Sequence, residues 1–307
     1  MTRTERAWVT AGLPAGAYEA LTHELSASRL WSLLLDVAEA RAAARRTASL
    51  IDQWERDAFV QPAYIDQRTQ LDVDRQLLDA AAAFESVELS PVAPLGVCSI
   101  MGPTSQNKVL SALRGTEVVS DPTNVIALEC ARRLRADRAA VVRLTTSHRC
   151  LRAQPFPKIR GFASHFRMFC LASAAFERPN HAFTVDAIAE HITVMLDALA
   201  RLERHGFAFP DRRIALLTTD ERAELGDRIA ARLDWPALAR ARLEHRYYDG
   251  IRFQISARST DGQEVPVFDG GTFDWVAQLA SNRHAVYVAS GLGSQLLPLL
   301  FRGSRGE

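Results

Sequence analysis

The 307-residue sequence lacks the features that mark several classes of protein. No apolar run approaches the roughly 18 to 20 residues that span a bilayer. The N-terminus, MTRTERAWVTAGLPAG, has no apolar core like that of a secretory signal. The 37 basic and 36 acidic side chains leave a net charge of +1, which gives no general argument for a nucleic-acid or membrane partner. We therefore expect a cytoplasmic protein that does not act at a membrane.

The chain is also poor in cysteine and in familiar catalytic motifs. Its four cysteines lie 20 or more residues apart and form no CxxC pair, a spacing that excludes a disulfide scaffold and indicates reduced thiols. The sequence has no GxGxxG, GxSxG or HExxH motif, and its eight histidines show no metal-binding spacing, so we expect no metal site. The hydrophobic content of 48% is sufficient for one large domain, or two modest ones, with a buried core.

The first 85 residues have an almost entirely helical pattern. Leu30, Leu34 and Val37 recur at helical spacing, and a second helix is predicted over residues 72–84, which are rich in strong helix formers. We expect a helical N-terminal extension over residues 1–65 and a core domain over residues 66–307. The basic stretch 41–46 would suit nucleic acid, but a solvated helix face is the simpler interpretation, and nucleic acid is not our expected partner.

From Glu85 onward the sequence predicts short strands between irregular loops, with helices gathered early and late. The expected strands are 85–91, 117–120, 141–149, 161–171, 214–217, 248–257, 264–268 and 285–289. The expected helices are 124–134, 185–205 with Thr184 as N-cap, and 295–301. This arrangement is typical of an α+β fold with a mostly antiparallel sheet of about six strands flanked by helices.

Five segments carry further information by their order. They are FESVELSP, HRCLRAQPFPKIRGFASHFRMF, RYYDGIRFQI, DGGTFDW and ASGLGSQLLPLL. This order resembles the catalytic core of class II aminoacyl-tRNA synthetases, and most closely the histidyl branch, over roughly residues 70–302. The resemblance places motif 1 at 84–91, motif 2 at 149–169, the histidyl-type tyrosine motif at 247–250, the glycine motif at 270–274 and motif 3 at 291–300. It implies a class II synthetase-like core with a helical N-terminal extension.

The resemblance also implies a site for ATP with Mg²⁺. Activation of a carboxylate by ATP places extra negative charge on the α-phosphate, which a fixed guanidinium stabilises. Arg149 lies where the family has its catalytic arginine. Phe162 matches the aromatic residue that stacks on adenine, and Gln154 matches a loop glutamine that follows the arginine, although this loop is one residue longer here. A surface arginine at a strand end is the alternative interpretation of Arg149.

The resemblance implies an amino-acid pocket beside the nucleotide. Asp121, with Thr123, stands where the family's Pro-Glu-Gly-Thr segment holds the substrate ammonium, although SDPTN is also an ordinary helix start. The expected lining residues are Asp121, Thr123, Ser164, Met168, Tyr247, Tyr248, Gly270, Gly271 and Thr272. The alternative interpretation of the two tyrosines is that they are neighbours in a strand, with one ring buried and the other exposed.

The sequence departs from the family at several positions. Leu151 replaces the motif 2 glutamate, and Leu296 lies where motif 3 has its arginine. Met168 stands where the histidyl branch has the acid that recognises imidazole; because a thioether accepts hydrogen bonds weakly, histidine is a poor candidate substrate. Since the chain ends directly after motif 3, we expect no anticodon-binding domain and no charging of tRNA by the usual route.

Two hypotheses follow from these matches and departures. The first is an ATP-dependent ligase that activates a small amino or related carboxylic acid for a non-tRNA acceptor, such as a carrier protein. The second is an inactive synthetase paralogue that acts as an amino-acid-sensing or scaffolding regulatory subunit. In either case we expect a homodimer, because class II cores bury motif 1 across a two-fold axis and Leu77, Leu78, Ala81 and Phe84 would supply an apolar face.

Overall fold

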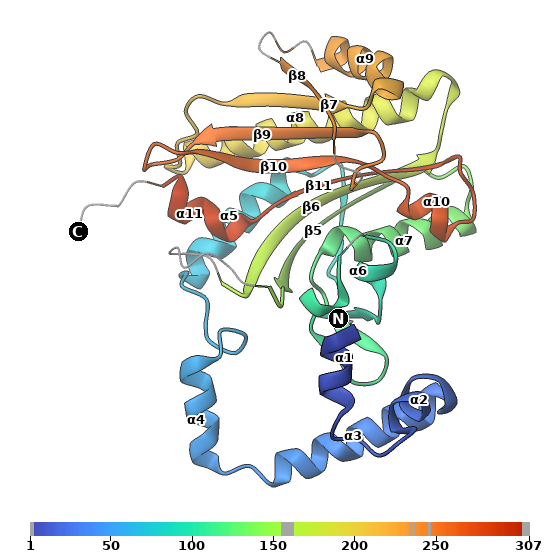
Figure 1. Cartoon of the computed structure of the whole chain (residues 1–307). Coiled ribbons are helices and arrows are strands. Elements are labelled where there is room, and N and C mark those ends of the chain that lie inside the picture. Colours follow the sequence, from blue (N-terminus) through green and yellow to red (C-terminus); the bar gives the residue numbers. More distant parts are fainter. Residues whose placement is uncertain are drawn as a thin grey trace, which may run out of the picture.

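The computed structural model describes residues 3–102, 104–154, 163–233, 235, 238–244 and 247–302. Its centre is a sheet of order β1-β5-β6-β11-β10-β9-β7-β8 (Figure 1). The six inner strands are antiparallel, and β1 and β8 add parallel pairs at the two edges. The expected α+β fold with a mostly antiparallel sheet is confirmed.

Several strands are longer than the sequence predicts, and the main sheet has eight strands rather than about six. The main sheet contains β1 (Glu85–Ser86), β5 (Val142–Leu151), β6 (His165–Phe176), β7 (Arg213–Thr218), β8 (Leu238–Arg242), β9 (Ile251–Arg258), β10 (Glu264–Phe273) and β11 (Ala285–Leu292). A small sheet of β2 (Val92–Pro94), β3 (Ser111–Ala112) and β4 (Thr116–Val118) lies apart from it. The strand expected over 85–91 pairs at only two residues, whereas β10 extends through the glycine motif.

Helices cover both faces of the sheet. The N-terminal segment contains α1 (Arg3–Thr10), α2 (Ala17–Glu19), α3 (Ala27–Ala43) and α4 (Thr47–Arg56). The domain contains α5 (Gln67–Ala80), α6 (Val97–Ile100), α7 (Pro122–Ala136), α8 (Ala182–Arg204), α9 (Ala223–Leu233), α10 (Trp275–Leu279) and α11 (Leu297–Leu300). None of the helices in the described part of the chain is long and apolar enough to cross a membrane.

Strand alternation assigns each side chain of the sheet to one of two faces. On one face, which we call the α8 face, Leu77 of α5 and Ile188 of α8 join Leu171, Phe253 and other residues in the larger core. The opposite face, which we call the α7 face, packs against α7 and α10 through a second core. That core includes Ile126, Ala172, Phe273, Trp275 and Tyr287.

The motif 1 residues do not form the dimer face that the sequence predicts. Leu77 and Ala81 are completely buried and Phe84 is nearly so, all within the core that α5 shares with α8 of the same chain. Leu78 is half-buried against that core. Leu77, Ala81 and Phe84 already contact their own domain and leave almost no apolar surface free, whereas Leu78 remains partly exposed. A homodimer stays a prediction.

The start of α8 also differs from the expectation. The helix begins at Ala182, two residues before Thr184, and His181 occupies the N-cap position with a φ of 53°. Thr184 lies inside the first turn, where its hydroxyl donates to the Glu177 carboxylate. Glu177 also accepts a hydrogen bond from the Phe183 amide, so a side chain from the preceding strand end replaces the expected cap.

A buried histidine connects α8 to the sheet and gives a pH prediction. His191 lies within 3.0 Å of the Ser173 hydroxyl and 2.8 Å of the Ser290 hydroxyl. Burial lowers the pKa of His191 to about 3. The unfolded chain therefore binds this proton more tightly, and stability should be complete above about pH 6.5 and fall by about 1.4 kcal/mol per unit between there and pH 3. His191→Gln should remove this component from urea unfolding curves measured across that range; an unchanged pH dependence would contradict it.

Candidate functional site

Half of the α7 face is left open by the helices. Over β5, β6 and β11 this face lies beneath α7 and α10, whereas Leu217, Arg252, Gln254 and Asp269 on β7, β9 and β10 are only half-buried. The N-terminus of α7 and the end of β5 border this open half. The candidate site is therefore a polar surface with a wall on one side.

Asp121 and Arg152 form that wall. Asp121 is the N-cap of α7, and its Oδ1 accepts hydrogen bonds from the amide and the hydroxyl of Thr123. Its Oδ2 lies 3.5 Å from Nη2 of Arg152. Arg152 donates from Nε to the Ser120 carbonyl at 2.9 Å, which fixes the direction of the guanidinium. Both side chains remain partly exposed, so this long ion pair leaves polar atoms available to a ligand.

Two residues of β6 support Arg152 from below. Its guanidinium carbon lies 5.1 Å from the centre of the Phe166 ring, within the range of a cation–π contact. Nη2 of Arg152 lies 3.6 Å from the Met168 sulfur. Phe166 and Met168 share the α7 face because they alternate with Phe169, which is buried in the opposite core. Strand pairing thus brings together four side chains: Arg152, Asp121, Phe166 and Met168.

The tyrosine motif closes the apolar side of the site. Tyr247 and Tyr248 meet edge to face at 5.1 Å, and both pack against Phe273, which stacks on Trp275. Burial raises the pKa of Tyr247, and the charge of Asp121 adds to this effect. Burial and the neighbouring Asp269 likewise raise the pKa of Tyr248. Both phenols are therefore neutral at ordinary pH.

A second ion pair lies across the open half from Arg152. Arg252 of β9 donates from Nε and Nη2 to the two carboxylate oxygens of Asp269, at 2.9 and 2.8 Å. Its guanidinium carbon lies 5.5 Å from the centre of the Tyr248 ring. The planar two-bond geometry and the ring contact hold Arg252 in one orientation.

The structure does not place Arg149, the expected catalytic arginine, beside this site. Arg149 pairs with Arg167 in the sheet, and both point to the α8 face, opposite to Met168 and Asp121. Nη1 of Arg149 lies 2.9 Å from Nδ1 of His165 and 3.4 Å from the Gln295 oxygen. Desolvation by burial and the Arg167 charge lower the pKa of Arg149. An arginine on this face cannot reach a ligand beside Asp121.

The glycine motif is divided between the two faces in the same way. Gly271 lies on the α7 face below Tyr248, whereas Gly270 packs against Ser290 and Phe253 on the α8 face. Thr272 also lies away from the site, and its hydroxyl donates to the Asp249 carbonyl at 2.6 Å. Of this motif, only Gly271 is placed where the sequence predicts a substrate contact.

Gly271 should tolerate no side chain. A Cβ at this position would lie 2.1 Å from the Ile251 carbonyl oxygen and 2.7 Å from Cδ1 of Tyr248. Because the oxygen belongs to the adjacent strand, Gly271→Ala should destabilise the chain by about 1–3 kcal/mol and displace Tyr248. Urea unfolding measures this, with Gly12→Ala as control because nothing lies within 4 Å of its Cβ position. Equal stability of the two variants would show that β9 and β10 can separate without cost.

The remaining predicted residues lie at the loop after β5. Gln154 is half-buried two residues beyond Arg152, and the Ser164 carbonyl accepts a hydrogen bond from the Arg152 amide at 2.8 Å. Ser164 therefore contributes its backbone here. Phe162 lies outside the described residues, so its predicted contact with adenine has no structural counterpart to report.

Sequence reasoning missed Arg152, Phe166, Arg252 and Asp269. One signal could have found the first two. In motif 2 of the family a glutamate follows the arginine by two residues. Arg152-Ala153-Gln154 keeps this spacing, with glutamine in place of the acid. Phe166 then lies five residues after Gly161, inside the return strand. No comparable signal marked Arg252, because its partner is fixed by pairing between β9 and β10.

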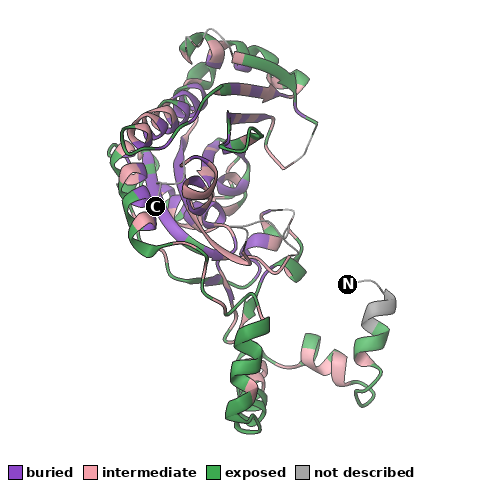
Figure 2. Cartoon of the chain, turned by 90° about the vertical axis from the view of Figure 1, so that its left-hand side faces the viewer, coloured by how far each residue is buried: buried purple, intermediate pink, exposed green. Residues whose placement is uncertain are grey.

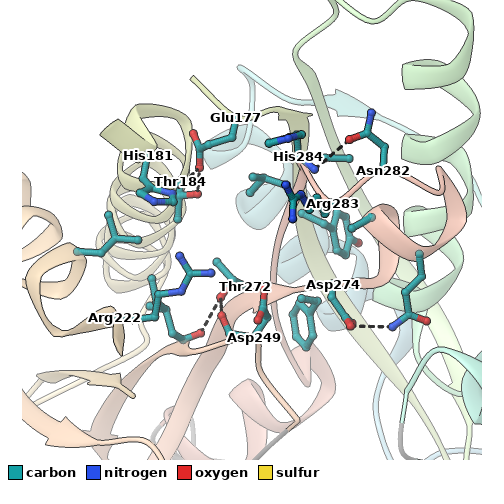
Figure 3. A pocket seen from close by; sticks show the side chains of 18 of the residues that line it. Glu177, His181, Thr184, Arg222, Asp249, Thr272, Asp274, Asn282, Arg283 and His284 are labelled. Atoms are coloured by element: carbon teal, nitrogen blue, oxygen red, sulfur yellow. Dashed lines mark hydrogen bonds and ion pairs between the residues drawn. The ribbon is translucent and has the colours of Figure 1, made fainter. Parts of the chain in front are cut away.

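A hollow lies elsewhere, where β9, β10 and β11 meet the starts of α8 and α9 (Figure 3). It has a volume of about 520 Å³ and includes Thr272, Asp249, Arg222 and Arg283 among its lining residues. Asp121 and Arg152 are not among them. This hollow therefore differs from the site around Asp121 and Arg152, although the predicted residue Thr272 and its neighbour Phe273 line it.

Comparison with known proteins identifies the fold. No family model and no curated protein matches the sequence. An ATP phosphoribosyltransferase regulatory subunit/histidyl-tRNA synthetase from Bacillus halodurans is similar in structure, with a TM-score of 0.59 and 14% identity over 77% of this chain and 81% of that one. Apo histidyl-tRNA synthetase from S. aureus has a TM-score of 0.58 and 10% identity over 78% and 67%. A histidine–tRNA ligase subunit from Alicyclobacillus acidocaldarius has 0.57 and 15% over 79% and 95%. The chain therefore has the class II synthetase-like fold.

Proposed function

We propose that this protein binds a small amino or related carboxylic acid on the open half of the α7 face and activates it with ATP for an acceptor other than tRNA. The observation that carries the proposal is the position of Arg152, beside Asp121 and above Phe166. Arg152 takes the role that the family resemblance gave to Arg149, and Gln154 then stands two residues later in place of the motif 2 glutamate.

The proposed reaction begins with attack of a carboxylate oxygen of the acid on the α-phosphorus of ATP. The bond from that phosphorus to the bridging oxygen breaks, and pyrophosphate leaves with the electron pair. The Arg152 guanidinium, held by its bond to the Ser120 carbonyl, would stabilise the charge that grows on the α-phosphate. Mg²⁺ would arrive with the nucleotide, since the described residues contain no group of three or more His, Cys, Asp or Glu side chains that could hold a metal ion.

The same residues would bind the ammonium group and the side chain of an α-amino acid. Oδ2 of Asp121 would accept a hydrogen bond from the substrate ammonium, because Oδ1 already accepts hydrogen bonds from the amide and hydroxyl of Thr123. Met168, Tyr248 and the ring of Phe273 would then surround the substrate side chain. A thioether and neutral phenols favour an uncharged side chain over a cationic one.

A second candidate function is amino-acid sensing without activation. Its specific support is motif 3, where Leu296 lies in place of an arginine and the buried Gln295 accepts a hydrogen bond from Arg149 on the α8 face. The neighbour whose name includes a regulatory subunit has the same fold. A binding pocket that kept Asp121 but lost γ-phosphate contacts would suit this role.

Calorimetry with Mg²⁺-ATP, followed by amino-acid-dependent pyrophosphate exchange over the twenty amino acids and common non-protein acids, distinguishes the two. Exchange with one acid supports the ligase. Binding of an acid with neither ATP binding nor exchange supports the sensor. Binding of neither ligand contradicts both.

A further inference from the structure

The hollow of about 520 Å³ described above, which we call the Arg222 hollow, takes no part in the proposed activity. Its walls come from the starts of α8 and α9, from β9 and β10, and from the turn 281–284 between α10 and β11 (Figure 3). The N-terminal helices α1 to α4 stand away from the sheet domain (Figure 2), and none of their described residues lines the hollow. Sites for small molecules usually measure about 300–1,000 Å³, so this hollow has the size for a small metabolite.

Two arginine side chains point into the Arg222 hollow from different walls (Figure 3). Arg222 stands just before α9, and Arg283 stands in the turn before β11. Neither guanidinium makes a hydrogen bond or an ion pair with any residue that the structure describes. Elsewhere in the domain, Arg143 and Arg252 each pair with a carboxylate. Two cations without such a partner in one hollow favour an anionic ligand.

The main chain below Arg222 holds its side chain in place. At Gly250, where φ is 80°, a Cβ would lie 2.7 Å from Cγ and 3.4 Å from Nε of Arg222. The stem of Arg222 therefore packs directly on a backbone that only glycine leaves uncovered. The Arg222 amide also donates to the Thr219 carbonyl at 3.1 Å. The guanidinium is thus directed before a ligand arrives, which lowers the entropy lost on binding.

The turn that carries Arg283 is attached to the domain on both sides. The Glu177 amide, directly after β6, donates to the His284 carbonyl at 2.8 Å. The Asn282 amide donates to the Ala277 carbonyl of α10 at 2.9 Å. Oδ1 of Asn282 accepts from the His284 amide at 3.0 Å. These bonds give the Arg283 backbone a defined position, although its side chain is exposed.

Three carboxylates also line the Arg222 hollow, and two of them already accept hydrogen bonds. Glu177 accepts from the Thr184 hydroxyl in the first turn of α8. Asp274 accepts from the Gln278 amide at 2.7 Å. The exposed carboxylate of Asp249 makes no hydrogen bond or ion pair with a described residue. Asp249 would repel a bare anion, but it can accept a hydrogen bond from a hydroxyl group of the same ligand.

From these observations we infer that the Arg222 hollow binds a small phosphate monoester that carries hydroxyl groups, with its phosphate between Arg222 and Arg283 and a hydroxyl group on Asp249. The three terminal oxygens of a phosphate monoester point in different directions, so guanidiniums on two walls can donate to it together, whereas a planar carboxylate matches one guanidinium fork. Leu225 and Val286 in the lining would contact the carbon skeleton. The inference does not depend on the proposed activity.

Isothermal titration calorimetry of the full chain with glycerol 3-phosphate, ribose 5-phosphate and inorganic phosphate tests the inference. At least one monoester should bind with a Kd below about 1 mM, and inorganic phosphate about tenfold more weakly, because it makes no hydroxyl contact. Arg222→Gln and Arg283→Gln should each weaken binding of the monoester by about 10- to 100-fold, the effect of losing a charged hydrogen bond. Asp249→Ala should weaken binding of the monoester and leave that of inorganic phosphate no weaker.

Arg75→Gln is the matched control, because it makes the same change in charge at an exposed position of α5 outside the hollow. Both this variant and Arg152→Ala should bind the monoester like the unaltered chain, and thermal unfolding should confirm that every variant is folded. Lack of binding of both monoesters overturns the inference, as does equal affinity for inorganic phosphate and the monoesters. Unchanged binding in Arg222→Gln and Arg283→Gln, or loss of binding in Arg75→Gln or Arg152→Ala, also overturns it; loss in Arg152→Ala would place the ligand on the α7 face.

Discussion

Arg152→Ala is expected to reduce amino-acid-dependent pyrophosphate exchange by about 10²–10³-fold, the usual effect of removing one donor that stabilises transition-state charge. Arg152 is the arginine on the α7 face that lies beside Asp121. Folding should change little, because the side chain is partly exposed and water can replace it at the Ser120 carbonyl. Exchange assays with purified variants and urea unfolding measure the two effects separately.

Two controls sharpen this result. Arg149→Ala should leave exchange nearly unchanged, because Arg149 lies on the α8 face with Gln295. Arg152→Lys keeps the charge but loses the planar fork, so it should recover only part of the rate. Loss of exchange in Arg149→Ala together with full exchange in Arg152→Ala would overturn the assignment of the site to the α7 face.

Asp74→Ala should cost about 1–3 kcal/mol of unfolding free energy, because the carboxylate is almost fully buried and its donors lose their acceptor, while its ion-pair partner Arg167 is still partly exposed. Asp74 lies almost fully buried on α5, with its Oδ1 accepting from Gln70 at 2.9 Å and Ser147 at 2.7 Å. Its other oxygen lies 3.4 Å from Nε of Arg167. The variant therefore removes the acceptor of the Ser147 hydroxyl and the charge partner of Arg167, while Gln70 keeps its bond to Ser294 and Arg167 its bond to the Ser147 carbonyl.

Asp72→Ala is the matched control, since it removes an exposed acid from the same helix and should cost little. Urea unfolding of both variants measures the difference. A loss of less than about 1 kcal/mol in the unfolding free energy of Asp74→Ala would contradict this prediction. It would mean that water enters and hydrogen-bonds to Arg167 after the carboxylate is removed.

The strand pattern of motif 2 could not decide between its two arginines. The stretch VRLTTSHRCL is covered by helices on both faces, so it shows no clean alternation of polar and apolar residues. Alternation therefore does not separate Arg149 from Arg152, and only the motif spacing, with Gln154 two residues after Arg152, favours the second. A strand ending at Arg149 was expected, but β5 continues to Leu151, and this added length carries Arg152 to the α7 face.

Asp121 shows the opposite case. SDPTN is an ordinary helix start by local chemistry alone, and in the structure Asp121 is the N-cap and Pro122 the first residue of α7, two residues before the expected start. Its possible role toward a ligand depends on Arg152, 31 positions later in the chain. Proximity of that kind arises only when the strands pair.

The sequence by itself determined the α+β class, most of the helices and strands, and the order of segments that marks the class II fold, because periodicity, caps and turn residues act over a few neighbouring positions. The tertiary structure alone decided which face each strand residue occupies, that the motif 1 helix is covered by α8, and that Arg252 meets Asp269. These depend on strand register and on which helices cover the sheet. A shift of one residue in a strand exchanges its two faces, and such long-range pairing leaves no local trace in the sequence.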